Sequence, residues 1–182
     1  MSAVIGQAEN NFTPIQLAHY TAMLANGGSD LDITLIREIV DQEGNTVDRA
    51  EIDEYVINRL GLEPRERQDI DMSPEHIEAV LEGMRAVTTE TGGTAHSIFR
   101  NFPFEVGGKT GSSEAGRGQV NGWFVGFAPF DEPEIAIVVG VENGGRGFHT
   151  AEVVRDILEV YFGLTDEIVE NRRARPISGV RN

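Results

Sequence analysis

The only lysine of this 182-residue chain, Lys109, lies in a glycine-rich stretch. The stretch reads Val106-Gly107-Gly108-Lys109-Thr110-Gly111-Ser112-Ser113-Glu114, between the apolar run 98–106 and the strand-like segment 123–128. Glycine lacks the side chain that would hold a second backbone away from a strand. The stretch therefore predicts a strand against which an anionic, peptide-like ligand lies backbone to backbone, with Lys109 supplying the positive charge.

The triplet Gly108-Lys109-Thr110 also matches the end of a phosphate-binding P-loop. That motif needs a glycine five residues before its last glycine, and a helix directly after the triplet. Pro103 holds the first of these positions, and the flexible, glycine-rich loop 112–118 follows in place of a helix. The sequence therefore disfavours a phosphate-binding loop.

The composition excludes several classes of partner. Thirty acidic residues against fifteen basic ones give a formal net charge of −15, which disfavours nucleic acid and anionic membrane surfaces. The chain has no cysteine, and no second ligand stands at metal spacing from His19, so we expect neither a metal nor a cofactor. No apolar run approaches the length of a membrane span and residues 1–6 are no signal peptide, so the chain itself is expected to be soluble.

The first predicted helix begins with a capping box. Thr13 is its N-cap, Pro14 its first residue and Gln16 the partner that completes the box. Phe12 and Leu17 can form a hydrophobic staple, and the glycines of segment 26–28 end the helix. The residues expected to face the core are Ile15, Ala18, Ala22 and Ala25.

Two more helices and three strands follow from the same kinds of pattern. Ser73-Pro74-Glu75 begins a helix that ends near 92–93, and the last helix follows the glycine loop 144–147. The expected core faces are Ile77, Val80, Leu81, Met84 and Val87 in the first, and Val153, Val154, Ile157, Leu158 and Tyr161 in the second. The Lys109 stretch and segments 123–128 and 135–141 form a strand meander, so the fold class is α+β.

Segment 30–71 is expected to be an acidic insertion. It contains thirteen acidic residues and five arginines, a net charge of −8. Residues 33–47 read as a small hairpin with Gly44-Asn45 at its tip, and residues 48–71 are polar and irregular. A solvated insertion is favoured over an acidic surface that binds a partner.

With these elements placed, the chain resembles the C-terminal part of the transpeptidase domain of a class B penicillin-binding protein. Lys-Thr-Gly is a signature element of that superfamily, which includes the serine β-lactamases. The matching segments stand in the family's order, and together with the residues between them they cover most of residues 4–163. They are 5–28 with Thr13-Pro14-Ile15-Gln16-Leu17-Ala18, 73–87 with Ser73-Pro74-Glu75-His76, Gly92-Gly93-Thr94-Ala95, and Gly108-Lys109-Thr110-Gly111 with Trp123-Phe124-Val125-Gly126-Phe127-Ala128-Pro129.

The resemblance implies a partial β-lactamase/transpeptidase-like fold. About three core strands and a small hairpin would pack with helices, and the N-terminal half of the fold would be missing. Residues 1–163 would form the C-terminal portion of the domain, and residues 164–182 a disordered tail. The strand at 135–141 would lack its N-terminal partner strand, so the fragment would associate with itself through that exposed edge.

The resemblance also implies the reaction and the site. The family's serine attacks a peptidoglycan stem peptide at its D-alanyl-D-alanine end, and β-lactams are trapped at the same acyl stage. Lys109 would supply positive potential, Thr110 would bind the substrate carboxylate, and Gly111 would let the ligand backbone approach. The backbone N–H of Ser112 would be one of two oxyanion donors.

The chain departs from the family at one decisive point. Its single lysine rules out a Ser-x-x-Lys motif, and none of its serines begins a Ser-x-Asn motif. We therefore expect a fragment that is inactive alone, taken from a parent anchored in the membrane with its catalytic domain outside the cytoplasm. The alternative is a non-enzymatic interaction module that keeps the half-fold; a β-lactamase, which also needs the missing serine, is disfavoured.

Overall fold

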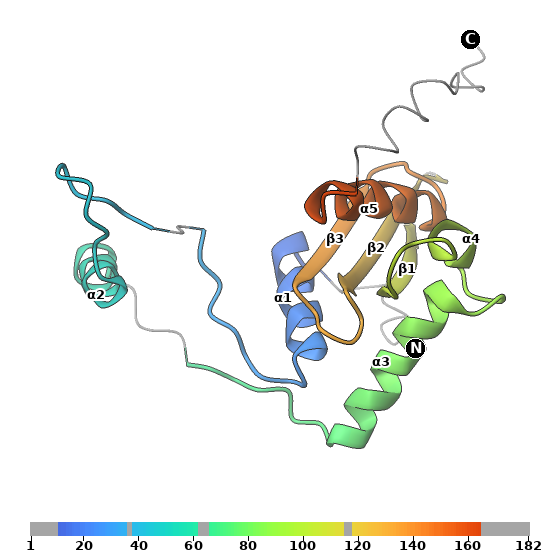
Figure 1. Cartoon of the computed structure of the whole chain (residues 1–182), viewed down its shortest axis with the longest axis horizontal. Helices are drawn as coiled ribbons and strands as arrows, with labels where there is room; N and C mark the ends of the chain where they lie inside the picture. Colours follow the sequence, from blue (N-terminus) through green and yellow to red (C-terminus); the bar gives the residue numbers. More distant parts are fainter. Residues whose placement is uncertain (1–10, 36–37, 62–65, 115–117, 165–182) are drawn as a thin grey trace, which may run out of the picture.

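The structure is a computed structural model that describes residues 11–35, 38–61, 66–114 and 118–164. Within them lie five helices and one three-stranded antiparallel sheet, which confirms the α+β class and the three predicted core strands (Figure 1). The elements are α1 (Pro14–Ala25), α2 (Arg49–Leu60), α3 (Pro74–Thr89), α4 (His96–Phe99), β1 (Gly107–Glu114), β2 (Val120–Ala128), β3 (Ile135–Val141) and α5 (Phe148–Tyr161). The tail predicted for residues 164–182 lies outside the described residues, apart from Leu164.

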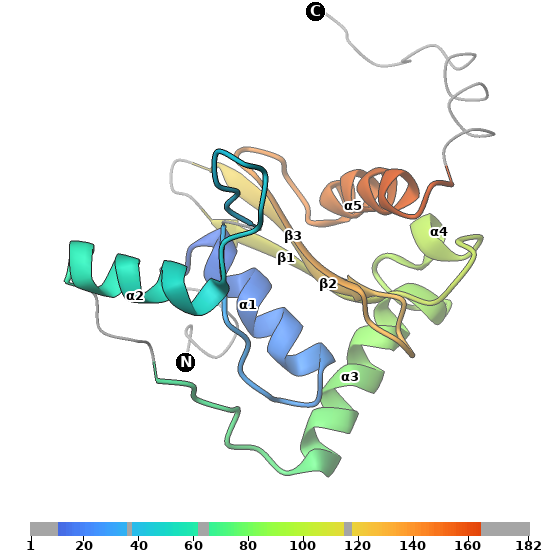
Figure 2. The same ribbon diagram turned by 60° about the vertical axis from the view of Figure 1, so that its left-hand side comes forward.

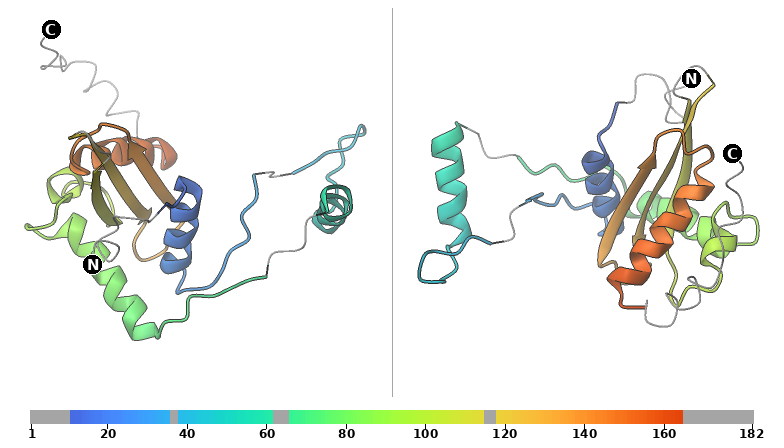
Figure 3. Two further views of the ribbon diagram at one scale, coloured as in Figure 1. Left: turned by 180° about the vertical axis from the view of Figure 1, so that it is seen from behind. Right: turned by 90° about the horizontal axis from the view of Figure 1, so that it is seen from above.

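The sheet has the strand order β1-β2-β3, so β1 and β3 are its edges. Lys109 on β1 stands opposite Val125 on β2, which in turn stands opposite Val138 on β3. Helix α5 covers one face of the sheet and α1 the other (Figure 3). Helix α3 packs against β1.

The two faces of β2 anchor two hydrophobic clusters. Phe124 and Phe127 are 0% and 1% exposed and lie three residues apart, so their side chains point to opposite faces. Phe124 belongs to the cluster with Val154 of α5. Phe127 belongs to the cluster with Leu24 of α1 and Met84 of α3. The central strand thus ties three helices together.

The predicted start of α1 is confirmed, but its predicted core face is wrong at Ile15; the other predicted residues, Ala18, Ala22 and Ala25, are half-buried, and Ala25 packs against the Leu24 cluster. Gln16 Oε1 accepts a hydrogen bond from the Thr13 backbone N–H at 2.9 Å, which completes the capping box. Ile15 is 51% exposed, however, and the buried residues of α1 are Thr21, Met23 and Leu24. The sheet lies against the side of α1 that carries these later residues.

In helices α3 and α5, too, only some of the predicted core residues are buried. Ile77 and Met84 of α3 are buried as predicted, whereas Val80 is exposed. Ser73 is the N-cap of α3, although its side chain makes no capping hydrogen bond. In α5, Val154 and Leu158 are buried as predicted. Three other residues predicted to face the core are exposed: Val153, Ile157 and Tyr161. Only one side of α5 contacts the sheet, so an apolar stripe wider than that side remains partly in solvent.

The acidic insertion contains a helix that the sequence did not predict. The expectation of irregular structure is wrong for residues 49–60, which form α2. The expected hairpin is reduced to a single bridge, between Val40 and Thr46. We call residues 38–61 the projecting unit, because α2 and this turn stand apart from the sheet (Figure 1, Figure 2).

Polar contacts join the two segments that connect the projecting unit to the body. The Ile70 N–H donates to the carbonyl of Gly28 at 2.8 Å. The Asp30 N–H donates to the carboxylate of Asp69 at 2.8 Å, and the Gln68 N–H donates to the carboxylate of Asp30 at 2.7 Å. His19 of α1 contacts the same Asp30 carboxylate at 2.9 Å. These contacts fix the base of the insertion and leave its far end in solvent.

Candidate functional site

The four predicted site residues lie next to one another on β1, an edge strand of the described sheet. Lys109 and Ser112 are exposed, and Thr110 and Gly111 are half-buried. Among the described residues Lys109 makes no ion pair, and its ammonium donates a hydrogen bond to the backbone carbonyl of Thr110. An open backbone edge therefore carries an unneutralised positive charge.

The glycines before Lys109 make room for aromatic rings of β2. A Cβ on Gly107 would lie 2.4 Å from Cζ of Phe127, and one on Gly108 would lie 2.3 Å from Cζ of Phe124. These two glycines are therefore required by packing on both faces of the sheet, rather than by close approach of a ligand. Gly111 is less confined, with Trp123 Cβ as its nearest contact at 3.3 Å.

The N-terminal end of α5 braces the strand at Gly111 and Ser112. The Gly147 N–H donates to Oγ of Ser112 at 3.2 Å. A Cβ on Gly147 would lie 2.2 Å from the carbonyl oxygen of Gly111, so only glycine allows this approach. The sequence predicts only a glycine loop at 144–147 and gives no sign of this contact, because the contact joins segments 35 residues apart.

A threonine outside the predicted set also contacts the site. Oγ1 of Thr94 lies 2.7 Å from Oγ1 of Thr110, within hydrogen-bonding distance. Thr94 stands in the Gly92-Gly93-Thr94-Ala95 segment, which the sequence analysis used for the resemblance without giving it a role. Either hydroxyl can donate in this contact, and where Thr94 is the donor the hydrogen of the Thr110 hydroxyl is free for a ligand.

Trp123 and Ser113 support the strand from the face that carries Lys109. The indole Nε1–H donates to Oγ of Ser113 at 3.1 Å. The ring lies over Gly140 of β3, where a Cβ would approach it to 2.5 Å. Trp123 therefore braces all three strands at the level of Gly111, its register partner.

An ion pair holds the segment that leads into β1. Glu105 accepts a hydrogen bond from Nε of Arg85 at 2.6 Å, and this bond raises the pKa of Arg85 above its ordinary value. Thr88 Oγ1 donates to the carbonyl of Val106 at 2.5 Å. Both partners come from α3, so this helix fixes where β1 begins.

A comparison with known protein families shows to which family the chain belongs. The profile described as "Penicillin binding protein transpeptidase domain" matches residues 1–159. The chain belongs to this family. Penicillin-binding protein 2A of Bacillus subtilis (strain 168) is 31% identical to this chain over 175 residues, which are 88% of the chain and 23% of that protein. Peptidoglycan D,D-transpeptidase MrdA of Escherichia coli (strain K12) is 26% identical over 170 residues, 85% of the chain and 25% of that protein.

Solved structures agree with this assignment. The crystal structure of Pseudomonas aeruginosa PBP2 in complex with WCK 5153 superposes with a TM-score of 0.70 and 33% identity, over 90% of this chain and 32% of that one. Penicillin-binding protein A of M. tuberculosis, an imipenem acyl-enzyme complex, has the same fold, with a TM-score of 0.67 over 88% of this chain and 33% of that one, at 24% identity. The relatives confirm the predicted class B transpeptidase domain and a partial transpeptidase fold. The chain spans about a quarter of the length of the curated relatives.

The described helices were also compared with the needs of a membrane span. None of them combines the length and the apolar character that crossing a bilayer requires.

Proposed function

We propose that this chain supplies the substrate-binding edge of a D,D-transpeptidase that cross-links peptidoglycan stem peptides. The observation that carries the proposal is the open edge strand β1, which holds Lys109, Thr110, Gly111 and Ser112 in one row. A peptide added beside such a strand gains backbone hydrogen bonds from groups that have no partner strand. The family and the names of the relatives support the choice of substrate.

Each residue of the row has a distinct part in this proposal. Lys109 attracts the C-terminal carboxylate of the stem peptide, since it carries a positive charge without an ion-pair partner among the described residues. Thr110 donates its hydroxyl hydrogen to that carboxylate, and Thr94 holds the hydroxyl in the donating orientation. Gly111 leaves space for the peptide backbone. The Ser112 N–H points to the developing oxyanion, because alternate N–H groups of an edge strand face away from the sheet.

The proposed reaction forms and breaks an ester in two steps. A serine hydroxyl adds to the carbonyl of the penultimate D-alanine, the C–N bond breaks, and the last D-alanine leaves with the proton. The amine of a second stem peptide then attacks the ester and restores the serine. Neither Ser-x-x-Lys nor Ser-x-Asn occurs in this sequence. We therefore infer that another segment supplies the nucleophile, and we expect this chain alone to be inactive.

The binding edge can be tested on the chain itself with N-acetyl-D-alanyl-D-alanine and with its C-terminal amide. Backbone amide shifts in an NMR titration should move at residues 109–113 with the acid, and much less with the amide. Lys109→Met should abolish the difference, because the positive charge is what distinguishes acid from amide. Arg59→Met, which removes a charge from α2, is the matched control and should leave it unchanged. Equal responses to acid and amide would refute the proposed carboxylate site.

The proposal extends to the location and partners of the parent protein. The proposed parent acts on peptidoglycan, so its catalytic domain lies outside the cytoplasm, held by a membrane anchor. β-Lactams would acylate its serine as mimics of the D-alanyl-D-alanine end. These proposals concern the complete gene product rather than this chain.

Self-association of the chain remains a separate proposal. Strand β3 is an edge of the described sheet, although α1 packs against one of its faces. Its backbone edge could pair with that of a second copy. Sedimentation equilibrium should therefore show a mass that rises with concentration, and a constant monomer mass over a wide range would contradict the proposal.

A further inference from the structure

The far end of β1 lies near two side chains of opposite charge. Glu114 is the last residue of the strand, and Arg146 stands in the segment that joins β3 to α5. Both side chains are exposed, and neither makes an ion pair within the described part of the chain. This end of the strand therefore presents one negative and one positive group to a ligand.

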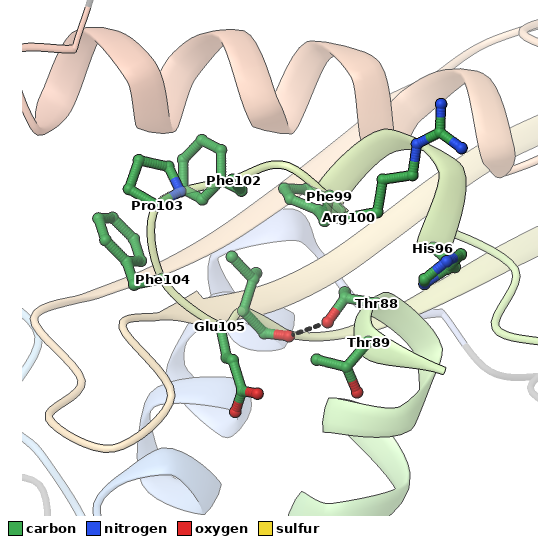
Figure 4. A pocket seen from close by; sticks show the side chains of 10 residues that line it. Thr88, Thr89, His96, Phe99, Arg100, Phe102, Pro103, Phe104 and Glu105 are labelled. Carbon is green, nitrogen blue, oxygen red and sulfur yellow. Dashed lines mark hydrogen bonds between the residues drawn. The ribbon is translucent and has the colours of Figure 1, made fainter. Parts of the chain in front are cut away.

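The segment that enters β1 differs, because its polar groups are bound to α3. Arg85 pairs with Glu105 at 2.6 Å and with Glu82 at 3.5 Å. The hydroxyl of Thr88 donates to the carbonyl of Val106 at 2.5 Å (Figure 4). Contacts within the chain thus occupy the start of the strand, and the unpaired charges stand at its end.

Two backbone hydrogen bonds hold Arg146 beside the end of β1. The residue before it donates its N–H to the carbonyl of Val120 at 3.0 Å, and Val120 is the register partner of Glu114. The residue after it donates its N–H to Oγ of Ser112 at 3.2 Å. Side chains two residues apart on a strand share a face, so Glu114 lies on the same face as Ser112 and this segment.

Other charged side chains near this segment do not cancel the pair. Glu142 follows the end of β3, which is the opposite edge of the described sheet. His149 of α5 contacts Glu152 of the same helix at 4.0 Å. The charges next to the end of β1 are therefore those of Glu114 and Arg146.

The proposed binding mode brings a particular residue of the peptide to this place. The C-terminal carboxylate of the peptide lies at Lys109 and Thr110, and its penultimate carbonyl lies at Ser112, so the peptide runs antiparallel to β1. Each residue of an extended chain advances it by about 3.3 Å. The third residue from the C-terminus therefore lies beside Ser113 and Glu114.

We propose that Glu114 and Arg146 determine which third residue the site accepts, and that this residue carries both an ammonium and a carboxylate on its side chain. The Glu114 carboxylate pairs with the ammonium, and the Arg146 guanidinium pairs with the carboxylate. A side chain with one of these charges leaves the other protein group unpaired. This inference rests on the proposed function, since the Lys109–Ser112 row sets the direction of the peptide.

The test is an NMR titration with three peptides of the form N-acetyl-X-D-alanyl-D-alanine. X is meso-diaminopimelate, which carries both side-chain charges, lysine, which carries only the ammonium, or aminopimelate, which carries only the carboxylate. The diaminopimelate peptide should bind about two- to fivefold more tightly than either of the others, as expected for one additional exposed ion pair. Saturable shifts should appear at residues 112–114 and 145–148.

Substitutions assign each charge to its partner. Arg146→Gln should weaken binding of the diaminopimelate peptide to the level of the lysine peptide and leave the lysine peptide unchanged. Glu114→Gln should weaken it to the level of the aminopimelate peptide and leave that peptide unchanged. Both positions are exposed, so both variants should fold. Arg59→Gln and Glu54→Gln on α2 are the matched controls and should have no effect.

The outcomes separate this inference from the proposed function. Equal binding of the three peptides would overturn the inference, and it would leave the proposed function standing if the chain still distinguishes N-acetyl-D-alanyl-D-alanine from its amide. Loss of that distinction as well would overturn both. Tighter binding of the diaminopimelate peptide that survives both substitutions would also contradict the assignment to Glu114 and Arg146.

Discussion

The β1–β2 pair and the projecting unit differ in what holds them in place. On β1 and β2, glycines let the buried rings of Phe124 and Phe127 pack directly under the backbone, so every position is fixed by tertiary contacts. In the projecting unit, Ile52 is the one buried hydrophobic side chain among those whose burial is described, residues 38–59, and caps and turns supply the rest. The candidate site is thus built on a strand that tertiary packing holds in place.

The largest expected effect is on the sheet. Phe124→Ala should destabilise the chain by about 3–5 kcal/mol, because it removes a fully buried ring that joins β2 to α5. Val160→Ala, at a 68% exposed position of α5, is the control and should change stability by less than about 0.5 kcal/mol. Urea denaturation followed by fluorescence measures both. Equal effects would mean that the sheet is not the stable part of the molecule.

A glycine substitution should sharpen the contrast between tight and open positions. Gly147→Ala should cost about 1–3 kcal/mol, since its Cβ would meet backbone atoms of Gly111 and Trp123 that cannot rotate away. Gly83→Ala in α3 meets nothing within 4 Å, and should stabilise by about 0.5–1 kcal/mol through helix propensity. The same denaturation experiment tests the predicted loss of stability in the first variant and the predicted gain in the second. A neutral Gly147→Ala would contradict the proposed brace.

Thr94 should affect binding more than stability. Thr94→Val should weaken binding of N-acetyl-D-alanyl-D-alanine by about 1 kcal/mol, because Thr110 loses the hydroxyl that orients it. Thr94→Ser should restore it. In a double-mutant cycle, the variant with both Thr94→Val and Thr110→Val should bind the peptide only slightly more weakly than the variant with Thr110→Val alone. Additive losses would show that the two hydroxyls act independently.

Ile52→Ala should break the projecting unit without unfolding the sheet. Amides of α2 should lose their protection from hydrogen exchange, because the helix loses the buried apolar side chain of Ile52. The free energy of unfolding of the sheet should change by less than about 0.5 kcal/mol. A loss of protection that reaches β2 would show that the two regions fold as one unit.

The smallest expected effect concerns the turn of the projecting unit. Hydrogen bonds from Asn45, first from its side chain and then from its backbone N–H, lower the pKa of Asp41. A carboxyl whose pKa is lowered by folding stabilises the turn above its unfolded pKa, and this contribution is lost as the pH falls through the folded value. NMR titration should therefore find a higher pKa for Asp41 in the Asn45→Ala variant. An unchanged pKa would contradict the assignment.

Local features could be read from the sequence, and tertiary ones could not. The start of α1 was predictable because Thr13 and Gln16 bond to each other within one turn. The core faces of α1 and α5 were not, since the exposure of Ile15 and Ile157 depends on where the sheet lies. Helix α2 was missed because a helix that is mostly polar gives no clear hydrophobic period, although Asp48 caps it and Gly61 ends it with φ of 63°.

In the candidate site, too, contacts between neighbours in the sequence were predictable and contacts between distant segments were not. The placement of Lys109, Thr110, Gly111 and Ser112 on one strand was predictable because they are adjacent in the chain, and their roles in binding stay a prediction. Thr94 and Gly147 were not, because each reaches the strand from a distant segment, across 16 and 35 residues. The packing role of Gly107 and Gly108 became visible only once the two rings of β2 were placed.

The most direct test of the central claim is the intact mass of this chain after incubation with penicillin, beside that of the full product of its gene. We predict a single penicilloyl adduct on the full product and none on this chain, because the chain holds the substrate edge without the nucleophile. An adduct on this chain, with Ser112 and Ser113 the first positions to map, would contradict the account. So would the absence of an adduct on the full product.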